Sequence, residues 1–347
     1  MTRIVALPME GRRMGRGLLK RPLGRIALAC VGLALAGRVV AFTLRPSPEA
    51  YPTLAARAGP PTPGQLTVRF LGTSTLAFDD GRDVVLIDGY LSRPGVVALL
   101  TRPLRPDQAA IVRHLKQADI RRISALYVAH THFDHALDSA SLAKAYGATL
   151  YGGDTMAAIA AAEGVTAPVH RLASGQPWTV GAFQITPFRT PHAPGDVAAG
   201  ATAADFRIPA RARAYPEGDA HSFLITHGTC RILIVPSAGH PGDVFHNVRS
   251  DVVMLGVGNL SRQGPEAVAA YWRDTVAATG ARLVVPIHWD DFSRSLDEPL
   301  KPFPYAIDRF DQTMKQLTAL AGDQIALRLP RAFEPMDWSG LPAGGCA

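Results

Sequence analysis

The chain has 347 residues, of which 47% are hydrophobic and 19% are charged, and this composition excludes a disordered, collagen-like or purely coiled-coil protein. Its formal net charge of +7 comes from residues 1–50, which hold nine of the 36 basic and two of the 29 acidic residues and so leave 27 of each sign for the remainder. This balanced remainder argues against a basic groove that binds nucleic acid.

Residues 1–45 are typical of a signal peptide or a short signal anchor. Seven basic residues precede an apolar run over residues 26–37, Arg38 interrupts the run, and residues 39–44 are apolar again. The first run alone is short for a transmembrane helix, whereas residues 26–44 together are long enough to span a membrane. Positive charge before the run predicts that the rest of the chain lies in the cell envelope, either anchored in the inner membrane and facing the periplasm or exported after cleavage. A buried N-terminal helix is the alternative.

The remaining chain divides into three parts. Residues 46–64 hold six prolines and are expected to form an extended linker, residues 65–335 form the main domain, and residues 336–347 form a tail. The cysteines are too few and too scattered for a disulfide framework or a Cys-rich zinc site. We expect Cys230, which lies in an apolar run, to be a small buried side chain, and Cys346 to lie in the frayed tail. The third is Cys30.

From residue 65 onward, short apolar segments bounded by turn residues predict two series of strands, each followed by strand–helix units. Two such series predict two sheets packed face to face with helices outside. A connection over residues 191–217, rich in Pro, Ala and Gly, is expected to be a lid or binding loop. The expected strands are 66–71, 75–78, 84–87, 125–129, 149–151, 177–180, 183–188, 222–226, 230–235, 252–255 and 283–286, and the expected helices are 107–118, 139–146, 155–162, 265–279 and 305–321.

A cluster of histidines directly follows the strand predicted at 125–129. Three imidazoles and a carboxylate lie within six residues, and packing does not explain them because His and Asp are costly to bury unpaired. Neutral imidazole and carboxylate are good ligands for zinc and similar divalent ions. His130 and His132 can point the same way from the loop, and Asp134 and His135 can form a second pair at the start of the next helix. The cluster therefore predicts a metal site.

The H-x-H-x-D-H pattern after a buried strand resembles the ligand loop of the metallo-β-lactamase-fold hydrolases, and supporting residues follow in the expected order. The resemblance implies an α/β fold, a four-layer αββα sandwich of two mixed β-sheets with the metals at one edge. It also implies that Asp88, in Leu-Ile-Asp-Gly, braces the ligand loop without binding metal. His192, in Thr-Pro-His, matches the third ligand station, and His288, in Val-Pro-Ile-His, matches the last.

Carried over residue by residue, the resemblance implies two sites with three ligands each. One metal would be held by His130, His132 and His192. The other would be held by Asp134, His135 and His288. The expected cofactor is Zn²⁺, as one or two ions, with iron or manganese as alternatives. A metal with three protein ligands keeps an open position, and its bound water has a pKa near ~7, so hydroxide is available at neutral pH.

One station departs from the family pattern. Many members carry Gly-Asp after the second-half hairpin, and that Asp bridges the two metals; here the stretch reads Gly-His, with His240 in its place and Asp243 three residues beyond. His240 is a terminal ligand, a group that hydrogen-bonds a ligand, or a solvent-facing residue. Without the bridging carboxylate, repulsion between the two dications is less well offset, so we expect the second metal to bind more weakly. Asp134 and Asp290 are the candidate catalytic carboxylates.

The leading hypothesis is a metal-dependent hydrolase in which metal hydroxide cleaves an ester, lactone, amide or phosphodiester bond. Residues 68–76 and 286–289 resemble the branch of the superfamily with lactonases and N-acylphosphatidylethanolamine-cleaving phospholipases, which implies a small-molecule or lipid-like substrate. The expected partners are this substrate and, through the N-terminal segment, a membrane, but no nucleic acid. The alternatives are an iron-dependent oxidoreductase of the sulfur dioxygenase type on the same fold, and a non-catalytic metal-binding protein.

Overall fold

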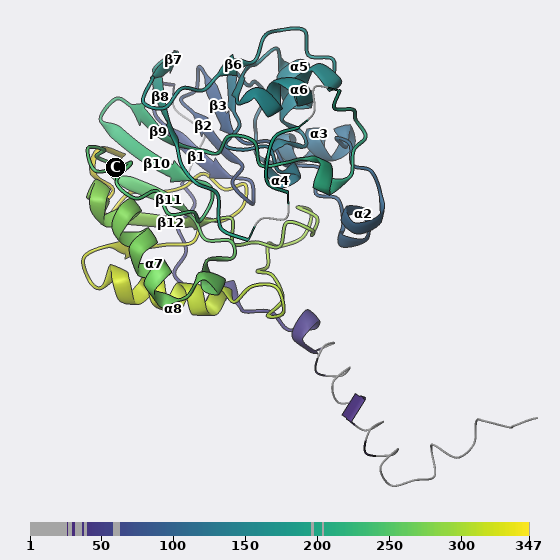
Figure 1. The fold of residues 1–347 in the computed structure, drawn as a ribbon. Coiled ribbons are helices and arrows are strands. Elements are labelled where there is room, and N and C mark those ends of the chain that lie inside the picture. The colour runs from purple at the N-terminus through teal and green to yellow at the C-terminus, as the bar shows by residue number, and fades with distance from the viewer. Residues whose placement is uncertain are drawn as a thin grey trace, which may run out of the picture.

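Two β-sheets pack face to face, and helices cover the outer face of each (Figure 1). The computed structural model describes residues 26, 30, 31, 37, 40–57, 63–195, 198–202 and 205–346. Each sheet begins as an antiparallel meander and continues with parallel strands. The four-layer αββα sandwich of two mixed sheets that the sequence predicts is confirmed.

The first sheet has six strands in chain order. Short turns join the first three, which are antiparallel, whereas longer connections that contain helices join the parallel strands that follow. Its strands are β1 (Thr67–Phe70), β2 (Leu76–Asp79), β3 (Val84–Ile87), β4 (Ala125–Tyr127), β5 (Thr149–Gly152) and β6 (His170–Arg171).

The second sheet has seven strands, again in chain order. The first four are antiparallel, and the last four, sharing β10, are parallel. Its strands are β7 (Trp178–Val180), β8 (Phe183–Arg189), β9 (His221–His227), β10 (Cys230–Val235), β11 (Val252–Gly256), β12 (Leu283–Ile287) and β13 (Ala326–Leu327).

The helices divide between the two outer layers. Those of the first sheet are α2 (Val96–Thr101), α3 (Gln108–Gln117), α4 (Phe133–Ala136), α5 (Ser139–Tyr146) and α6 (Asp154–Ala162), and those of the second are α7 (Pro265–Trp272) and α8 (Phe310–Ala321). Three differ from expectation. Helix α2 is not predicted by the sequence because its six residues lack a polar face. The helix predicted at 265–279 is α7 followed by a π-helix over Arg273–Ala277, and α8 begins five residues later than predicted, after a turn at residues 305–307.

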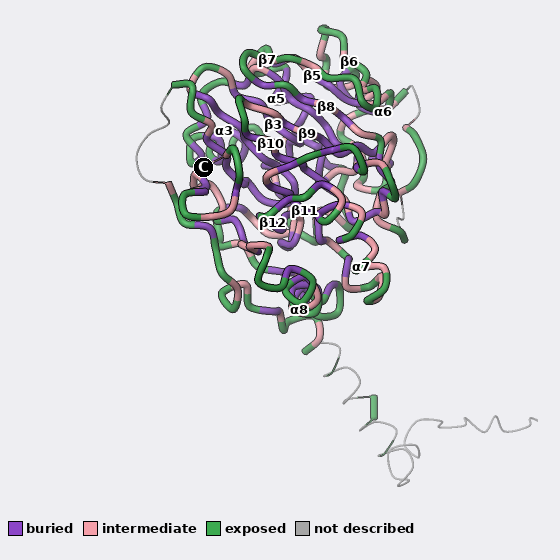
Figure 2. The backbone as a smooth tube through the Cα atoms, turned by 90° about the vertical axis from the view of Figure 1, so that its left-hand side faces the viewer, coloured by how far each residue is buried: buried purple, intermediate pink, exposed green. Residues whose placement is uncertain are grey.

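The hydrophobic core has two parts that follow the period-two alternation of the strands. In β3, Val85 and Ile87 point between the sheets, whereas Leu86 points toward the outer helices. Figure 2 shows the buried strands through the centre of the molecule and the exposed helix surfaces and loops around them. Both faces of the central strands are buried, so the strand ends at one edge are left to carry polar side chains.

The segments on either side of the main domain pack against it. In the predicted linker, Leu54 is buried and its backbone N–H donates to Leu329. In the predicted tail, Trp338 and Ala343 are buried: the backbone N–H of Met336 donates to the carbonyl oxygen of Val68 in β1, and residues 344–346 contact β10. The predicted signal or anchor at residues 1–45 lies mostly outside the described residues, and within the described part of the chain no helix is long and apolar enough to cross a membrane.

A disulfide bond joins Cys230 of β10 to Cys346, with the two Cα atoms 4.4 Å apart. Cys230 is therefore not simply a small buried side chain, and Cys346 is not in a frayed end. The sequence separation of 116 residues hides the pairing, because only the fold brings the C-terminus to β10. The bond attaches the C-terminal residues to the second sheet.

Candidate metal centre

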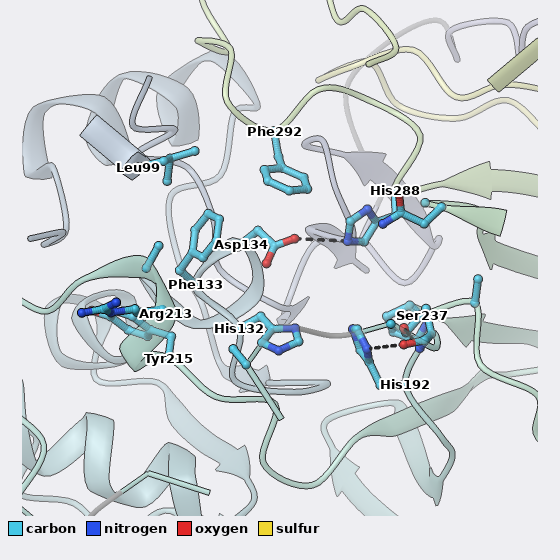
Figure 3. Close-up of a pocket in the computed structure, with 18 of the residues that line it drawn as sticks. Leu99, His132, Phe133, Asp134, His192, Arg213, Tyr215, Ser237, His288 and Phe292 are labelled. Carbon is cyan, nitrogen blue, oxygen red and sulfur yellow. Dashed lines mark hydrogen bonds and ion pairs between the residues drawn. The ribbon is translucent and has the colours of Figure 1, made fainter. Parts of the chain in front are cut away.

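The predicted ligands meet at one edge of the sandwich because each follows the end of a strand. β4 leads into His130 and His132, and the short helix α4 that follows carries the next two ligands. β8 and β12 end just before His192 and His288. Figure 3 shows four of these side chains, from both halves of the fold, directed toward a common space. The six candidate ligands form two groups of three, each with its ligand atoms within 4.8 Å of one another.

The first group consists of His130, His132 and His192. Their ring centroids are 4.7 to 4.8 Å apart in all three pairs. The Nδ1 atom of His192 lies 2.9 Å from the carbonyl oxygen of Ala193, which only accepts, so Nδ1 carries the proton and Nε2 is left as the lone-pair nitrogen.

His130 gives the clearest test of whether a metal fits this group. Its buried Nε2 atom has no hydrogen-bond partner among the described residues, which is unusual for a buried polar atom. Burial, followed by the neighbouring imidazoles of His135 and His192, holds the pKa of His130 well below its usual range. His130 is therefore a neutral imidazole with a free lone pair, as a metal ligand must be.

The second group consists of Asp134, His135 and His288. The Nε2 atoms of the two imidazoles are 3.2 Å apart, and the Oδ2 atom of Asp134 lies 3.3 Å from Nε2 of His288 and 3.7 Å from Nε2 of His135. Burial alone would raise the pKa of Asp134, but the adjacent imidazoles of His135 and His288 lower it below its usual range. The three atoms thus converge as one carboxylate oxygen and two imidazole nitrogens, a donor set that suits zinc.

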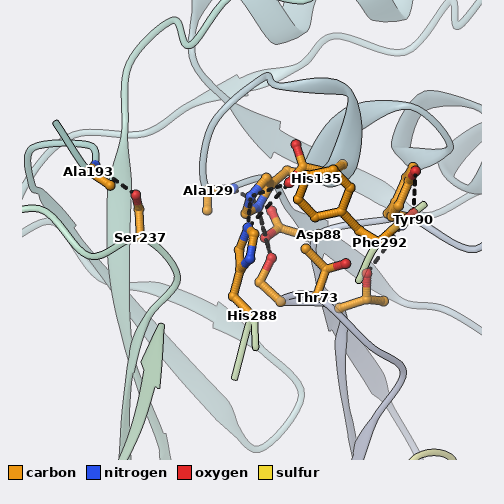
Figure 4. Close-up of polar contacts among 12 residues, drawn as sticks. Thr73, Asp88, Tyr90, Ala129, His135, Ala193, Ser237, His288 and Phe292 are labelled. Carbon is orange, nitrogen blue, oxygen red and sulfur yellow. Dashed lines mark hydrogen bonds and ion pairs between the residues drawn. The ribbon is translucent and has the colours of Figure 1, made fainter. Parts of the chain in front are cut away.

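Asp88 orients His135 and holds the ligand loop at the same time (Figure 4). Its Oδ2 atom lies 2.7 Å from Nδ1 of His135, and its Oδ1 atom accepts the backbone N–H of Ala129 at 2.7 Å. Ser74 donates its hydroxyl to Asp88 at 2.5 Å. The carboxylate therefore keeps the proton of His135 on Nδ1 and leaves Nε2 for the metal. The structure places Asp88 behind the ligands, where the resemblance expects it.

The candidate catalytic role of Asp290 is not supported. Its carboxylate is fully buried, accepts the backbone N–H of Thr73 at 2.8 Å and pairs with Arg93 at 2.8 Å. Asp290 belongs to neither ligand group. It positions the turn at Thr73, whose carbonyl oxygen accepts the backbone N–H of His288 at 2.5 Å. Asp134, the other candidate carboxylate, lies in the second ligand group.

His240 does not join either ligand group. Its Nε2 atom lies 3.0 Å from Oε1 of Gln263, whose amide in turn donates to the carbonyl oxygen of Ala238 at 2.8 Å. Asp243 is exposed and lies outside both groups as well. Of the roles left open for His240, the contact with Gln263 shows a hydrogen bond that ties its loop to the 3₁₀ helix η4 (Leu260–Gln263).

A cavity of about 600 Å³ opens onto the ligands. His132, Asp134, His192 and His288 line it together with Arg211 and Arg213 and with aromatic and aliphatic side chains. The latter include Leu99 and Leu100 of α2, Phe133 and Phe292. The sequence did not reveal these apolar residues as part of the site, because nothing in the local pattern distinguishes them from core residues. The available signals were that Phe133 lies between two ligands and that Phe292 is the fourth residue after His288.

Known proteins have sequences and folds similar to those of this chain. The model of the β-lactamase superfamily domain matches residues 84–289, which is more than half of the chain and includes all six candidate ligands. The chain therefore belongs to the metallo-β-lactamase superfamily. Together with the two ligand groups and the relative described next, this makes it a metal-dependent hydrolase of that superfamily.

One curated relative and two solved structures are examples of the proteins that this chain resembles. A UPF0173 metal-dependent hydrolase of Symbiobacterium thermophilum is 25% identical over 229 residues, which cover 65% of this chain and 85% of the relative. An isothiocyanate hydrolase from Delia radicum gut bacteria is similar with a TM-score of 0.50 and 17% identity, covering 79% of this chain and 99% of that one. A variant of CmlA, a β-hydroxylase, has a TM-score of 0.50 and 13% identity, covering 78% of this chain and 53% of that one. The structural likenesses show the shared fold alone.

Proposed function

We propose that this protein hydrolyses an ester, lactone, amide or phosphodiester bond in a small molecule with a substantial apolar part, using zinc at the two ligand groups. The chemistry that Zn²⁺ supplies when held by three protein ligands is the activation of water for attack at neutral pH. The observation that carries the proposal is the convergence of both groups on a cavity whose lining is largely apolar.

The protein's own residues prepare this site in three ways. His130 is neutral, and Asp88 holds a proton of His135 on Nδ1, so Nε2 is the nitrogen of His135 that faces the metal. Asp134 stays anionic and supplies negative charge between the imidazoles. Phe133 and Phe292 line the cavity next to the ligands and exclude water there, which strengthens electrostatic interactions with a bound substrate.

A lipid-like substrate, as in the lactonase and phospholipase branch that the sequence resembles, is part of the proposal. Its support is the apolar side of the cavity, where Leu99, Leu100 and Phe292 suit an acyl chain better than a polar sugar or nucleotide. Arg211 and Arg213 also line the cavity, so the apolar part of the substrate is expected to bind against the leucine and phenylalanine side chains.

The envelope location is also part of the proposal. Disulfide bonds persist in the bacterial periplasm and outside the cell, where thiols are not kept reduced. The bond between Cys230 and Cys346 is therefore consistent with export directed by residues 1–45. A reporter enzyme fused to the C-terminus that is active only in the cytoplasm would contradict this location.

The test is a hydrolysis panel on the full chain, with phosphodiesters, lactones, β-lactams and lipid amides, before and after chelation and after reloading with zinc. His132→Ala is expected to abolish the chelator-sensitive turnover and to lower the metal content. His246→Ala is the matched control, because His246 is exposed and bonds only to the neighbouring loop. Turnover that survives both chelation and His132→Ala would refute the metal-dependent mechanism. Restoration of activity by iron together with consumption of oxygen would favour the oxidoreductase instead.

A further inference from the structure

Helix α2 exposes apolar side chains that a globular protein ordinarily buries. Val96, Val97 and Leu100 have exposed fractions of 55%, 65% and 75%, and the value for Leu100 is the highest among the large apolar side chains of the described residues. The helix has only six residues and projects from the outer edge of the molecule (Figure 1). Adjacent exposed apolar residues of this kind mark an interaction surface.

Arginines surround this apolar helix. Residues 94–106 contain Arg102 and Arg105 and no acidic residue, and residues 206–213 contain three arginines and no acidic residue. The two segments are joined by a pair of backbone hydrogen bonds between Leu104 and Ala210. Arg211 also donates to the carbonyl oxygen of Thr101 at the end of α2. The apolar helix thus lies within a positively charged rim.

The same helix borders the cavity of the metal centre. Leu99 and Leu100 line that cavity together with Phe292. Any surface that contacts α2 from outside therefore lies at the cavity mouth. A molecule that leaves this surface can reach the ligands along apolar side chains.

A series of contacts leads from the cavity to the described end of the N-terminal apolar segment. Phe292 contacts Phe303, with ring centroids 4.9 Å apart. Two residues further, the N–H of Tyr305 donates to the carbonyl oxygen of Leu44 at 3.1 Å. Leu44 and Phe42 are themselves more than half exposed. The partly buried Phe292 and Phe303 therefore connect the cavity to the point where the N-terminal segment meets the domain.

We propose that α2 and its rim of arginines dock on an anionic lipid surface, with Val97 and Leu100 inserted between the headgroups and acyl chains. A short apolar wedge surrounded by arginines matches the anionic headgroups and the acyl layer of such a surface. A second copy of the chain fits less well, because a symmetric contact through this face would place arginines against arginines. The cavity mouth then opens toward the lipid.

The test measures insertion at residue 100 in the full chain, because the N-terminal segment is expected to bring the whole protein to vesicles in any case. Cys30→Ser removes the free cysteine, and Leu100→Cys carries an environment-sensitive fluorophore. Leu320→Cys is the matched control, since Leu320 is a partly exposed leucine on α8, which packs on the other sheet. The vesicles are phosphatidylcholine alone or with 30% phosphatidylglycerol, and no substrate is added.

With the anionic vesicles, we expect the label at residue 100 to gain at least threefold in fluorescence and to be quenched by lipids that carry a quencher on the acyl chain. The label at residue 320 should not change. Arg102→Glu together with Arg105→Glu should remove most of the gain. An unchanged label at residue 100 would overturn the proposal, as would a gain without lipid that rises with protein concentration, which would show a second copy instead. Neither result depends on catalytic activity, so the experiment tests the docking surface independently of the proposed hydrolysis.

Discussion

Asp88→Asn is expected to weaken metal binding at the second ligand group while leaving the first group intact. The substitution keeps the shape of the side chain, and Oδ1 of the asparagine can still accept the N–H of Ala129. The amide nitrogen then replaces Oδ2, which faces Nδ1 of His135 at 2.7 Å. Two N–H groups cannot donate to each other, so the proton of His135 moves to Nε2, the nitrogen that the metal needs.

The size of this effect follows from the contacts that are lost. Removing a carboxylate that orients a ligating histidine typically lowers metal affinity about 10- to 100-fold, which corresponds to roughly 1.4–2.8 kcal/mol. The charge-assisted bond to His135 also contributes to stability, so the free energy of unfolding should fall by about 1.5–3 kcal/mol. Titration of zinc against a competing chromophoric chelator resolves the two affinities, and urea unfolding of the chelated protein gives the change in stability.

Asp138→Asn is the matched control for this experiment. Asp138 is as deeply buried as Asp88 and, like it, accepts hydrogen bonds from the backbone and from a serine hydroxyl. Its donors are the N–H groups of Leu91 and Ser92 and the hydroxyl of Ser92, and none of these bonds involves an imidazole. It should change stability without changing the metal affinity of either group. Equal zinc affinities in the wild type and in folded Asp88→Asn would refute the claim that Asp88 sets the proton position of His135.

Three further outcomes are expected. Asp290→Asn leaves its buried arginine partner without a counter-charge, so the free energy of unfolding should fall by about 3–5 kcal/mol in a denaturant titration. Zinc binding at the second group should also weaken, because His288 loses its support. An unchanged stability would contradict the buried ion pair. Cys230→Ser removes a cross-link across 116 residues, which should lower the free energy of unfolding by about 4 kcal/mol. As the control, chemical reduction of the disulfide in the wild type should lower the free energy of unfolding by the same amount. His240→Asp should leave the zinc content unchanged, because His240 contacts Gln263 instead of the ligands; a tighter second site would show that the side chain turns toward the metals.

The fold and the ligand positions could be predicted because both depend on local sequence patterns. A ligand such as His192 or His288 directly follows an apolar strand, and the ends of neighbouring strands meet at one edge of a sheet. The metal-site prediction depends mainly on one loop, in which His130, His132, Asp134 and His135 lie within six residues. These features need no knowledge of how distant segments pack.

The features that could not be predicted depend on contacts between distant segments. Asp290 lies two residues after a ligand, and only its pairing with Arg93, nearly two hundred residues earlier, shows that it supports the turn at Thr73. The disulfide at Cys346 depends on where the C-terminus packs. Helix α2 has no amphipathic pattern, because its apolar residues face both the cavity and the exterior.

The turn at Thr73 and Ser74, which joins β1 and β2, contacts ligands from both halves of the fold. Ser74 bonds to Asp88 and lies 2.8 Å from Nδ1 of His135, and these two residues follow strands of the first sheet. Thr73 accepts the N–H of His288, which follows a strand of the second sheet. The geometry of the second ligand group is therefore a direct measure of how the two sheets are aligned. A substitution in the core between the sheets that shifts one against the other should release this metal at temperatures where the protein is still folded, so metal release becomes an early indicator of lost alignment far from any ligand.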